Sequence, residues 1–281
     1  MTISELLLLS TIRIETVTPK GICTGTGFFF NFLYNKESHL GIPAIVTNKH
    51  VIKDVIRGKL RFSLKDESGN PKWGQFYDLN VEDFERCWIM HPENSVDLCI
   101  MPIAFIHNLV HEKNVELCYT SLTMDEIPSK SEMDNIFSRI EDITIVGYPD
   151  GIWDAANNMP IVRKGITATA LQLDFNNEPK FLVDAAIYGG SSGSPVFIFN
   201  QGSYFTNSAL VAGSRLKLVG IIYAVAQHTV TGDIKIVDVP VSRIPVTETN
   251  IPNNLGVAIH ARKLKDFENI LKERECKQEE G

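Results

Sequence analysis

A short segment dense in glycine and serine, Gly189 to Pro195, is the part of the sequence best suited to chemistry. It reads GGSSGSP and leads into the apolar run Val196 to Phe199. Glycines allow tight backbone turns and bring several N–H groups towards one point. A serine in such a cradle, Ser192, could attack a carbonyl while the N–H groups stabilise the oxyanion. A β-turn or a phosphate-binding loop remains an alternative, although the lysine and the following helix of a Walker loop are missing.

A serine hydroxyl is a weak nucleophile that needs a base, and the base needs an orienting partner. His50 follows the apolar run Ala44 to Thr47, where a strand breaks into a polar turn. Asp97 heads the apolar run Leu98 to Ile103. A carboxylate there would be partly buried and would require a hydrogen-bond partner such as a histidine N–H. Taken singly, a histidine at the end of a strand is more often structural than catalytic.

These candidates lie at the ends of short apolar runs separated by Gly, Asn, Asp and Pro clusters, a pattern that favours a β-rich architecture. The runs predicted as strands are Thr11 to Thr16, Gly27 to Leu33, Ala44 to Thr47, Leu60 to Leu64, Leu98 to Ile103, Ile143 to Val146, Ile166 to Leu173, Phe181 to Val183, Ser194 to Phe199, Leu216 to Ala226 and Ile234 to Val239.

Two other segments differ from this pattern. Ser121 to Arg139 is more polar, with a helical turn predicted at Met133 to Ile140, and we interpret it as the connection between two halves. From Ala261 to Glu275, apolar residues recur at helical spacing among charged ones, which predicts an amphipathic helix packed on the body.

Six short motifs together resemble the chymotrypsin clan of trypsin-like serine proteases, and among them the HtrA-type (Deg) protease domain without a PDZ domain. They run from about residue 25 to 260 in the order His, Asp, Ser, which is the chymotrypsin order. The matching segments are Gly25 to Phe28 (G-[ST]-G-F), Thr47 to Val51 (T-N-x-H-V), Asp97 to Ile100 (D-[LI]-A-[LV]), Gly147 to Pro149 (G-x-P), Asp184 to Gly193 (D-A-A-I-x-x-G-N-S-G) and Leu218 to Ile221, similar to the strand that follows the nucleophile loop.

The resemblance implies an all-β fold: a chymotrypsin-like double β-barrel with a C-terminal α-helix. Residues 1–120 would form the N-terminal barrel with His50 and Asp97, and 121–140 the linker between barrels. Residues 141–260 would form the C-terminal barrel with Ser192, followed by a helix and tail at 261–281. The two barrels would make one peptidase domain with the triad in the cleft between them.

The resemblance also implies the roles. Ser192 would be the nucleophile, His50 the base and then the acid, and Asp97 the residue that holds the imidazole. The backbone N–H groups of Gly190 and Ser192 would form the oxyanion hole. Ser191 and Ser194 are competing serines, but the register of the motif selects Ser192.

Ser191 departs from trypsin-type enzymes, which carry an aspartate there that pairs with a new N-terminus after zymogen cleavage. A serine cannot make that ion pair, so we expect no such activation. The family register also places the specificity pocket at Ala186 and Ile187, with Tyr223, Ala224 and Val225 as the opposite wall. The pocket base has no carboxylate, and Val225 stands where trypsin-type enzymes have glycine. The family register therefore predicts a small or medium aliphatic side chain before the scissile bond.

Composition limits the partners. The 281 residues carry a formal net charge of -7 with no basic stripe, which argues against nucleic-acid binding. The run Leu6 to Leu9 is too short for a signal-peptide core and follows Glu5, and no stretch of about 18 apolar residues predicts a membrane span. The five cysteines are odd in number and form no CxxC, so we expect mostly buried thiols in a reducing compartment, the cytoplasm.

No metal or cofactor is expected. His107 and His111 are four residues apart, but the glutamate of HExxH is missing. The segment Gln201 to Arg215 is either an exposed hairpin or a regulatory loop.

The sequence therefore predicts a cytoplasmic serine endopeptidase that acts through an acyl-enzyme on protein or peptide substrates. Because the chain offers no PDZ domain, we expect few substrates and control by a regulatory protein partner. Two alternatives stay open: a catalytically silent protease-fold protein that binds peptides or partners, and a general quality-control protease.

Overall fold

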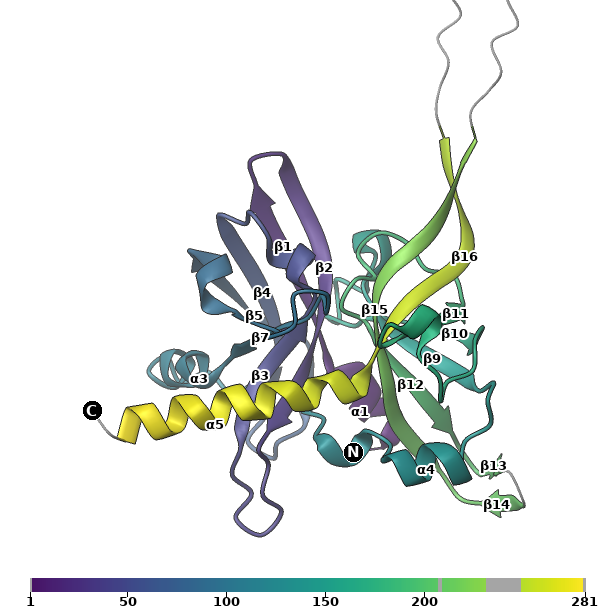
Figure 1. Cartoon of the computed structure of the whole chain (residues 1–281). Helices are drawn as coiled ribbons and strands as arrows, with labels where there is room; N and C mark the ends of the chain where they lie inside the picture. Colours follow the sequence, from purple (N-terminus) through teal and green to yellow (C-terminus); the bar gives the residue numbers. More distant parts are fainter. Residues whose placement is uncertain (1, 207–208, 231–248, 280–281) are drawn as a thin grey trace, which may run out of the picture.

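The computed structural model describes residues 2–206, 209–230 and 249–279, and these form two β-structured halves (Figure 1). The first half is an eight-stranded antiparallel sheet in the order β5-β4-β1-β2-β3-β7-β6, with β8 paired to β4. Its strands are β1 (Thr11–Thr18), β2 (Gly21–Phe32), β3 (Ile42–Thr47), β4 (Arg57–Lys65), β5 (Pro71–Glu82), β6 (Ile89–Met90), β7 (Cys99–Pro102) and β8 (Leu117–Cys118).

The second half is a closed barrel in the order β10-β11-β16-β15-β12-β9. A separate hairpin, β13 (Ser203–Phe205) and β14 (Leu210–Ala212), projects from it. The barrel strands are β9 (Asp142–Gly147), β10 (Ile161–Thr167), β11 (Lys180–Asp184), β12 (Pro195–Asn200), β15 (Arg215–Val230) and β16 (Thr249–His260).

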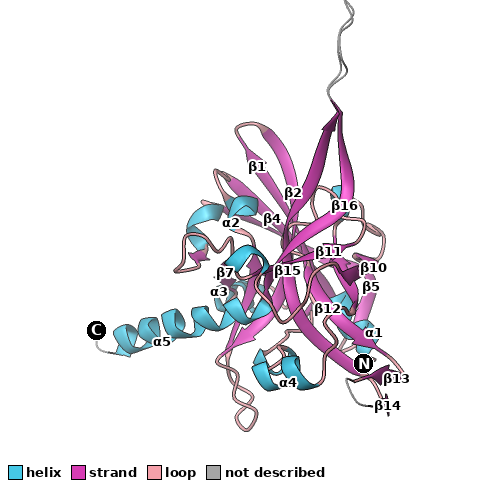
Figure 2. Ribbon diagram, turned by 45° about the vertical axis from the view of Figure 1, so that its right-hand side comes forward, coloured by secondary structure: helices cyan, strands magenta, loops and turns pink. Residues whose placement is uncertain are grey.

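Short helices and the longer C-terminal helix α5 surround the two sheets (Figure 2). The α-helices are α1 (Ile3–Leu9), α2 (Lys49–Ile52), α3 (Ala104–His111), α4 (Lys130–Asn135) and α5 (Lys265–Glu279). Single 3-10 turns are η1 (Phe84–Cys87), η2 (Met124–Glu126), η3 (Pro149–Gly151), η4 (Phe175–Asn177) and η5 (Ala261–Leu264).

The alternation of side chains along β2 explains how the halves pack together. Phe28, Phe30 and Phe32 point to one face and join a core cluster with Phe197 of the barrel and Phe267 of α5. Phe29 points to the other face and belongs to the core of the first half. Because successive strand residues face opposite sides, one strand contributes to both cores. The C-terminal helix is thereby held against the first half, as Figure 1 shows.

The fold class is confirmed: the structure is mostly β, with barrel-forming sheets and a C-terminal helix. Some element boundaries differ from expectation. The strand predicted at Ile166 to Leu173 ends at Thr167, and the turn predicted at Met133 to Ile140 is instead α4, whose N-cap Ser129 forms a capping box with Glu132. The strand predicted at Ile234 to Val239 lies outside the described residues.

Candidate active site

The ladder between β3 and β7 brings His50 and Asp97 together. The last pair of this ladder is Thr47 with Cys99. His50 follows Thr47 by three residues and lies in α2, and Asp97 precedes Cys99 by two residues. His50 Nδ1 lies 2.5 Å from Asp97 Oδ2, and the backbone N–H of His50 donates to Asp97 Oδ1 at 3.2 Å. Asn48 donates its side-chain amide to the Asp97 carbonyl at 2.7 Å. Adjacent secondary structure therefore fixes both partners.

The surroundings of Asp97 favour its ionised form. Burial raises the pKa of Asp97, but hydrogen bonds from the His50 side chain and from the His50 and Lys49 backbone, together with the His50 charge, bring that pKa below its usual value. The imidazole of His50 is about half exposed, whereas the Asp97 side chain is 25% exposed. A charged carboxylate is thus held on one side of an imidazole whose other side faces outward.

Ser192 lies in the tight loop between β11 and β12. Gly190 has φ +79° and Gly193 has φ +87°, conformations that residues with a Cβ rarely adopt. A Cβ on Gly193 would also lie 1.9 Å from the carbonyl oxygen of Thr26, so only glycine fits against β2. The glycines therefore both shape the loop and let it approach the first half.

Thr26 on β2 links the Ser192 loop to both halves through hydrogen bonds. Its N–H donates to the Ser192 carbonyl at 2.9 Å, and its hydroxyl donates to the Gly190 carbonyl at 2.9 Å. The same hydroxyl accepts from the Tyr148 N–H at 3.0 Å, and the Thr26 carbonyl accepts from the Thr47 hydroxyl at 2.7 Å. Since Thr47 lies three residues before His50, these bonds place the Ser192 loop next to the His50–Asp97 pair.

Two donors in the loop are free to bind a ligand. Among the hydrogen bonds of the residues that the structure describes, none uses the backbone N–H of Gly190 or of Ser192. Neighbouring groups are engaged, because the Ser191 N–H donates to the Tyr188 carbonyl and the Asp150 N–H to the Gly189 carbonyl. Within the same described residues, no hydrogen bond joins the Ser192 hydroxyl to His50; such contacts commonly tighten only when substrate binds.

The residues expected to form the specificity pocket lie in the segment after β11 and on β15. Ala186 is exposed, and its carbonyl accepts a hydrogen bond from the guanidinium of Arg163. Ile187 is 1% exposed and belongs to the barrel core, where it lies beside Gly256, the ladder partner of Val225. Tyr223 is half buried with its ring 4.9 Å from Lys180 Nζ.

Three other predictions concern the pocket wall on β15, a metal site at the histidines and the segment Gln201 to Arg215. Ala224 and Val225 lie on β15, but their side chains are outside the described part of the chain. Within the described residues, no group of three or more His, Cys, Asp or Glu side chains is arranged to hold a metal ion. His107 Nε2 instead lies 2.5 Å from the Tyr119 hydroxyl. The segment Gln201 to Arg215 contains the exposed hairpin of β13 and β14.

Sequence reasoning missed the positioning roles of Thr26, Thr47 and Arg163. Thr26 stands in the quoted G-T-G-F motif, and a threonine between two glycines was the available signal. The sequence around Arg163 does not indicate its role, because its partners are distant in the chain: the Ala186 carbonyl and, at 4.9 Å, the Tyr188 ring.

This chain resembles several solved structures of proteases. The chain is 15% identical to an HtrA-type protease, AlgW, determined with a tripeptide, covering 92% of this chain and 58% of that one with a TM-score of 0.45. It is 15% identical to the Rv3671c protease from M. tuberculosis in its active form, covering 94% of this chain and 80% of that one, also with a TM-score of 0.45. The serine endoprotease from Yersinia pestis gives 16% identity, covering 79% of this chain and 56% of that one with a TM-score of 0.41.

This chain therefore spans somewhat more than half the length of the AlgW and Yersinia proteins. No curated protein matches it. The family comparison is more decisive, because the trypsin-like peptidase domain matches residues 25–205, which is more than half of the sequence and includes every candidate triad residue. The chain belongs to the trypsin-like peptidase family.

Proposed function

We propose that this protein is a serine endopeptidase whose catalytic triad is His50, Asp97 and Ser192. The observation that carries the proposal is the 2.5 Å contact between His50 Nδ1 and Asp97 Oδ2, beside a glycine-rich serine loop with two unused N–H groups. A structural histidine–aspartate pair would need neither the outward-facing imidazole nor the free donors.

In the proposed reaction, His50 Nε2 takes the proton from the Ser192 hydroxyl as its oxygen attacks the scissile carbonyl. The N–H groups of Gly190 and Ser192 then bind the oxyanion, a contribution of about 3–4 kcal/mol for one such donor. The imidazolium, stabilised by Asp97, protonates the leaving amine and leaves an acyl-enzyme. A water molecule, deprotonated by His50, then hydrolyses the acyl-enzyme.

A fluorophosphonate probe tests this assignment. The wild-type protein should be labelled and should cleave peptides, and Ser192→Ala should lose both properties. Ser194→Ala is the matched control, since the Ser194 hydroxyl is buried and makes no hydrogen bond. A wild-type protein that neither reacts nor cleaves would favour the silent peptide-binding alternative, whereas labelling that persists in Ser192→Ala would assign the nucleophile to another serine.

We further propose that Ser191 removes the need for zymogen cleavage. The Ser191 hydroxyl accepts a weak hydrogen bond from the Tyr188 N–H at 3.4 Å, and the residue is 4% exposed, so Ser191 contacts its own loop. Intact mass measured on the fully active protein should equal that of the uncut chain. Activity that arises only after N-terminal cleavage would contradict this.

For substrate preference, we propose a small or medium aliphatic side chain before the scissile bond. The support is Ala186 at the expected base and the cationic Arg163 bonded to its carbonyl, which would repel Lys or Arg. A peptide-library profile should show aliphatic residues at this position, and one dominated by Lys or Arg would refute the assignment.

The biological setting we propose is a cytoplasmic protease with few protein substrates, switched by a protein partner. Its support is that Cys23, Cys87, Cys99 and Cys118 are all free thiols, Cys99 and Cys118 being buried. No helix in the described part of the chain has the length and apolar character to cross a membrane. Mapping new protein N-termini in cells that express wild type or Ser192→Ala should reveal one or two cleavages, whereas hundreds would indicate general quality control.

A further inference from the structure

The connection between β9 and β10, residues 148–160, belongs to the second half but contacts the first. Its Trp153 ring lies against the guanidinium groups of Arg13 on β1 and Arg61 on β4, whose central carbons are 5.1 and 5.0 Å from the ring centre. Further along, Asn158 is 7% exposed and donates its side-chain amide to a serine hydroxyl on β4 at 2.9 Å. The connection is therefore anchored on the first half at two points.

The position of the two arginines indicates why an aromatic ring lies there. The ladder of β1 and β4 ends with Ile14 opposite Leu60, and the next residue of each strand is an arginine. Since facing residues of paired strands point to the same side of a sheet, the two guanidinium groups project next to each other. Like charges so placed destabilise a sheet, whereas an aromatic face attracts a cation. Each guanidinium also has a carboxylate partner on the sheet, so Trp153 completes a site that is built to hold its ring.

The same connection begins next to the Ser192 loop. The Tyr148 ring is 1% exposed and lies 6.3 Å from the Trp153 ring, edge to face. Two residues after Tyr148, the Asp150 N–H donates to the Gly189 carbonyl at 2.5 Å. Because Asp150 is only three residues from Trp153, anchoring the ring also restricts the place of this N–H.

The orientation of one oxyanion donor depends on that hydrogen bond. The Gly189 carbonyl and the Gly190 N–H belong to one peptide unit, and in a planar trans peptide they point in opposite directions. Glycines on both sides leave this peptide free to rotate, so a donor that holds the Gly189 oxygen also aims the Gly190 N–H. The Ser192 N–H is aimed from within the loop, because the Ser194 N–H donates to the Ser191 carbonyl at 3.0 Å. Only the first donor therefore depends on residues outside the loop.

We propose that Trp153, held by Arg13 and Arg61 of the first half, is a positioning residue for the oxyanion hole. The inference rests on the proposed peptidase function, because it concerns the use of the Gly190 N–H in the reaction. A ring that only joined the two halves would contribute to stability alone. A positioning residue also affects how strongly the site binds an oxyanion.

Inhibition by a peptide aldehyde tests this role. The Ser192 oxygen bonds to the aldehyde carbon, the serine proton passes to His50, and the former carbonyl oxygen becomes an oxyanion in the hole. Trp153→Ala should weaken aldehyde inhibition at least tenfold and leave inhibition by the matching peptide alcohol, which forms no oxyanion, within twofold. Trp153→Phe keeps an aromatic face and should restore most of the aldehyde affinity. Trp73→Ala, at a tryptophan 49% exposed on β5, is the matched control and should bind both inhibitors as wild type.

The arginine partners have a test of their own. Arg61→Gln should weaken aldehyde inhibition at least fivefold, because the ring loses one of its two cations. Arg57→Gln makes the same change in charge on the same strand, at a guanidinium paired with Glu82, and should not. Both inhibitors are compared on the same variant, so a loss of folded protein would affect them equally. Equal weakening of aldehyde and alcohol, or no weakening in Trp153→Ala, would overturn the proposal.

Hydrogen exchange of the Asp150 N–H tests the anchor without catalysis, and it is measured in the Ser192→Ala background. Adding Trp153→Ala should accelerate this exchange at least tenfold, because the bond to Gly189 opens more often, whereas adding Trp73→Ala should not. Unchanged exchange overturns the inference whether or not the wild-type protein is active. Faster exchange together with an inactive wild-type protein would contradict the peptidase function while still supporting Trp153 as the residue that positions this loop.

Discussion

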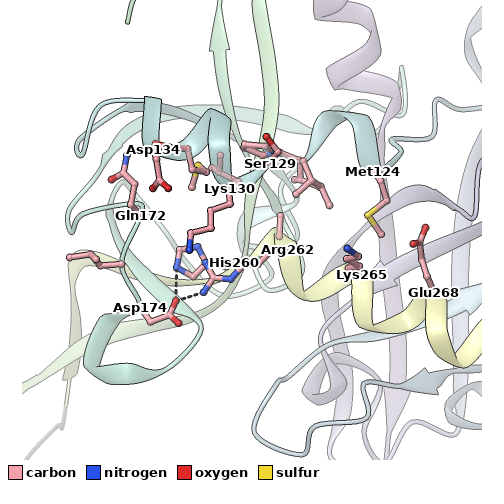
Figure 3. A pocket seen from close by; sticks show the side chains of 17 residues that line it. Met124, Ser129, Lys130, Asp134, Gln172, Asp174, His260, Arg262, Lys265 and Glu268 are labelled. Carbon is pink, nitrogen blue, oxygen red and sulfur yellow. Dashed lines mark hydrogen bonds and ion pairs between the residues drawn. The ribbon is translucent and has the colours of Figure 1, made fainter. Parts of the chain in front are cut away.

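At the candidate triad, and again beside the C-terminal helix, a histidine lies next to an aspartate. At the candidate triad, His50 Nδ1 is 2.5 Å from the Asp97 carboxylate and the ring is about half exposed. Beside the helix, His260 Nε2 is 3.4 Å from Asp174 (Figure 3) and makes no hydrogen bond, and the His260 side chain is almost fully buried.

The carboxylates differ as well as the imidazoles. Asp97 receives backbone hydrogen bonds from the His50 turn, so its main partner is the histidine. Asp174 is shared with the guanidinium of Arg262. The same two residue types therefore lie in different surroundings: the His50 ring is about half exposed, whereas the His260 ring is buried and burial keeps it neutral at pH 7.

The largest effect expected from this difference follows from removing each carboxylate charge. Asp97→Asn should lower kcat/KM roughly 10⁴-fold, because the amide favours the wrong imidazole tautomer. Asp174→Asn should leave peptide hydrolysis within about twofold, since the partners of Asp174 are His260 and Arg262, outside the candidate triad. Equal losses in steady-state assays of the two variants would show that the two regions are not functionally distinct.

A second difference is the glycine-rich loop of Ser192, which the hydrogen bonds of Thr26 and Thr47 place next to the His50–Asp97 pair. Gly193→Ala should lower kcat roughly 10²–10³-fold, because the new Cβ meets the Thr26 carbonyl and displaces the oxyanion donors. Gly202→Ala is matched, with φ +84° but nothing within 4 Å of the added carbon, and should cost little activity. Full activity in Gly193→Ala would show that the loop is not held as described.

Thr26 tests whether the loop depends on the first half. Thr26→Val removes a donor to Gly190 and leaves the Tyr148 N–H buried without a partner, so we expect unfolding to be easier by about 3 kcal/mol and activity to fall about tenfold. Thr26→Ser should restore both. Thr16→Val is the control, because it removes a buried hydroxyl on β1 that makes a single weak hydrogen bond of 3.4 Å. Urea unfolding and kcat should be measured for each of these variants.

The sequence predicted what depends on local pattern. The runs that became β3 and β7 are apolar and short, and the candidates His50 and Asp97 lie next to their ends, where the ladder brings them together. Helix α3 was missed although Ile106 and Val110, four residues apart, form its buried face.

What the sequence could not predict rests on distant contacts. Thr26 stands in a short motif, but its hydrogen bonds reach residues 122 and 164 positions away, and the motif does not show which residues these are. Ile187 packs in the barrel core beside Gly256, a distant position that the pattern around Ile187 does not indicate.

The smallest expected effect concerns the contribution of His260 to the pH dependence of stability. The pKa of His260 is about 4 when folded and about 6.5 when unfolded, so the unfolded chain binds more protons between these values. Stability is therefore lost as pH falls through this window, by about 2 kcal/mol between pH 7 and pH 5. The free energy of unfolding is measured with urea at several pH values. His260→Gln should remove the loss of stability between pH 7 and pH 5 that His260 causes, whereas His111→Gln, at an exposed residue, should retain it. An unchanged slope in His260→Gln would mean that this imidazole is not held neutral, and the contrast with His50 would lose its physical basis.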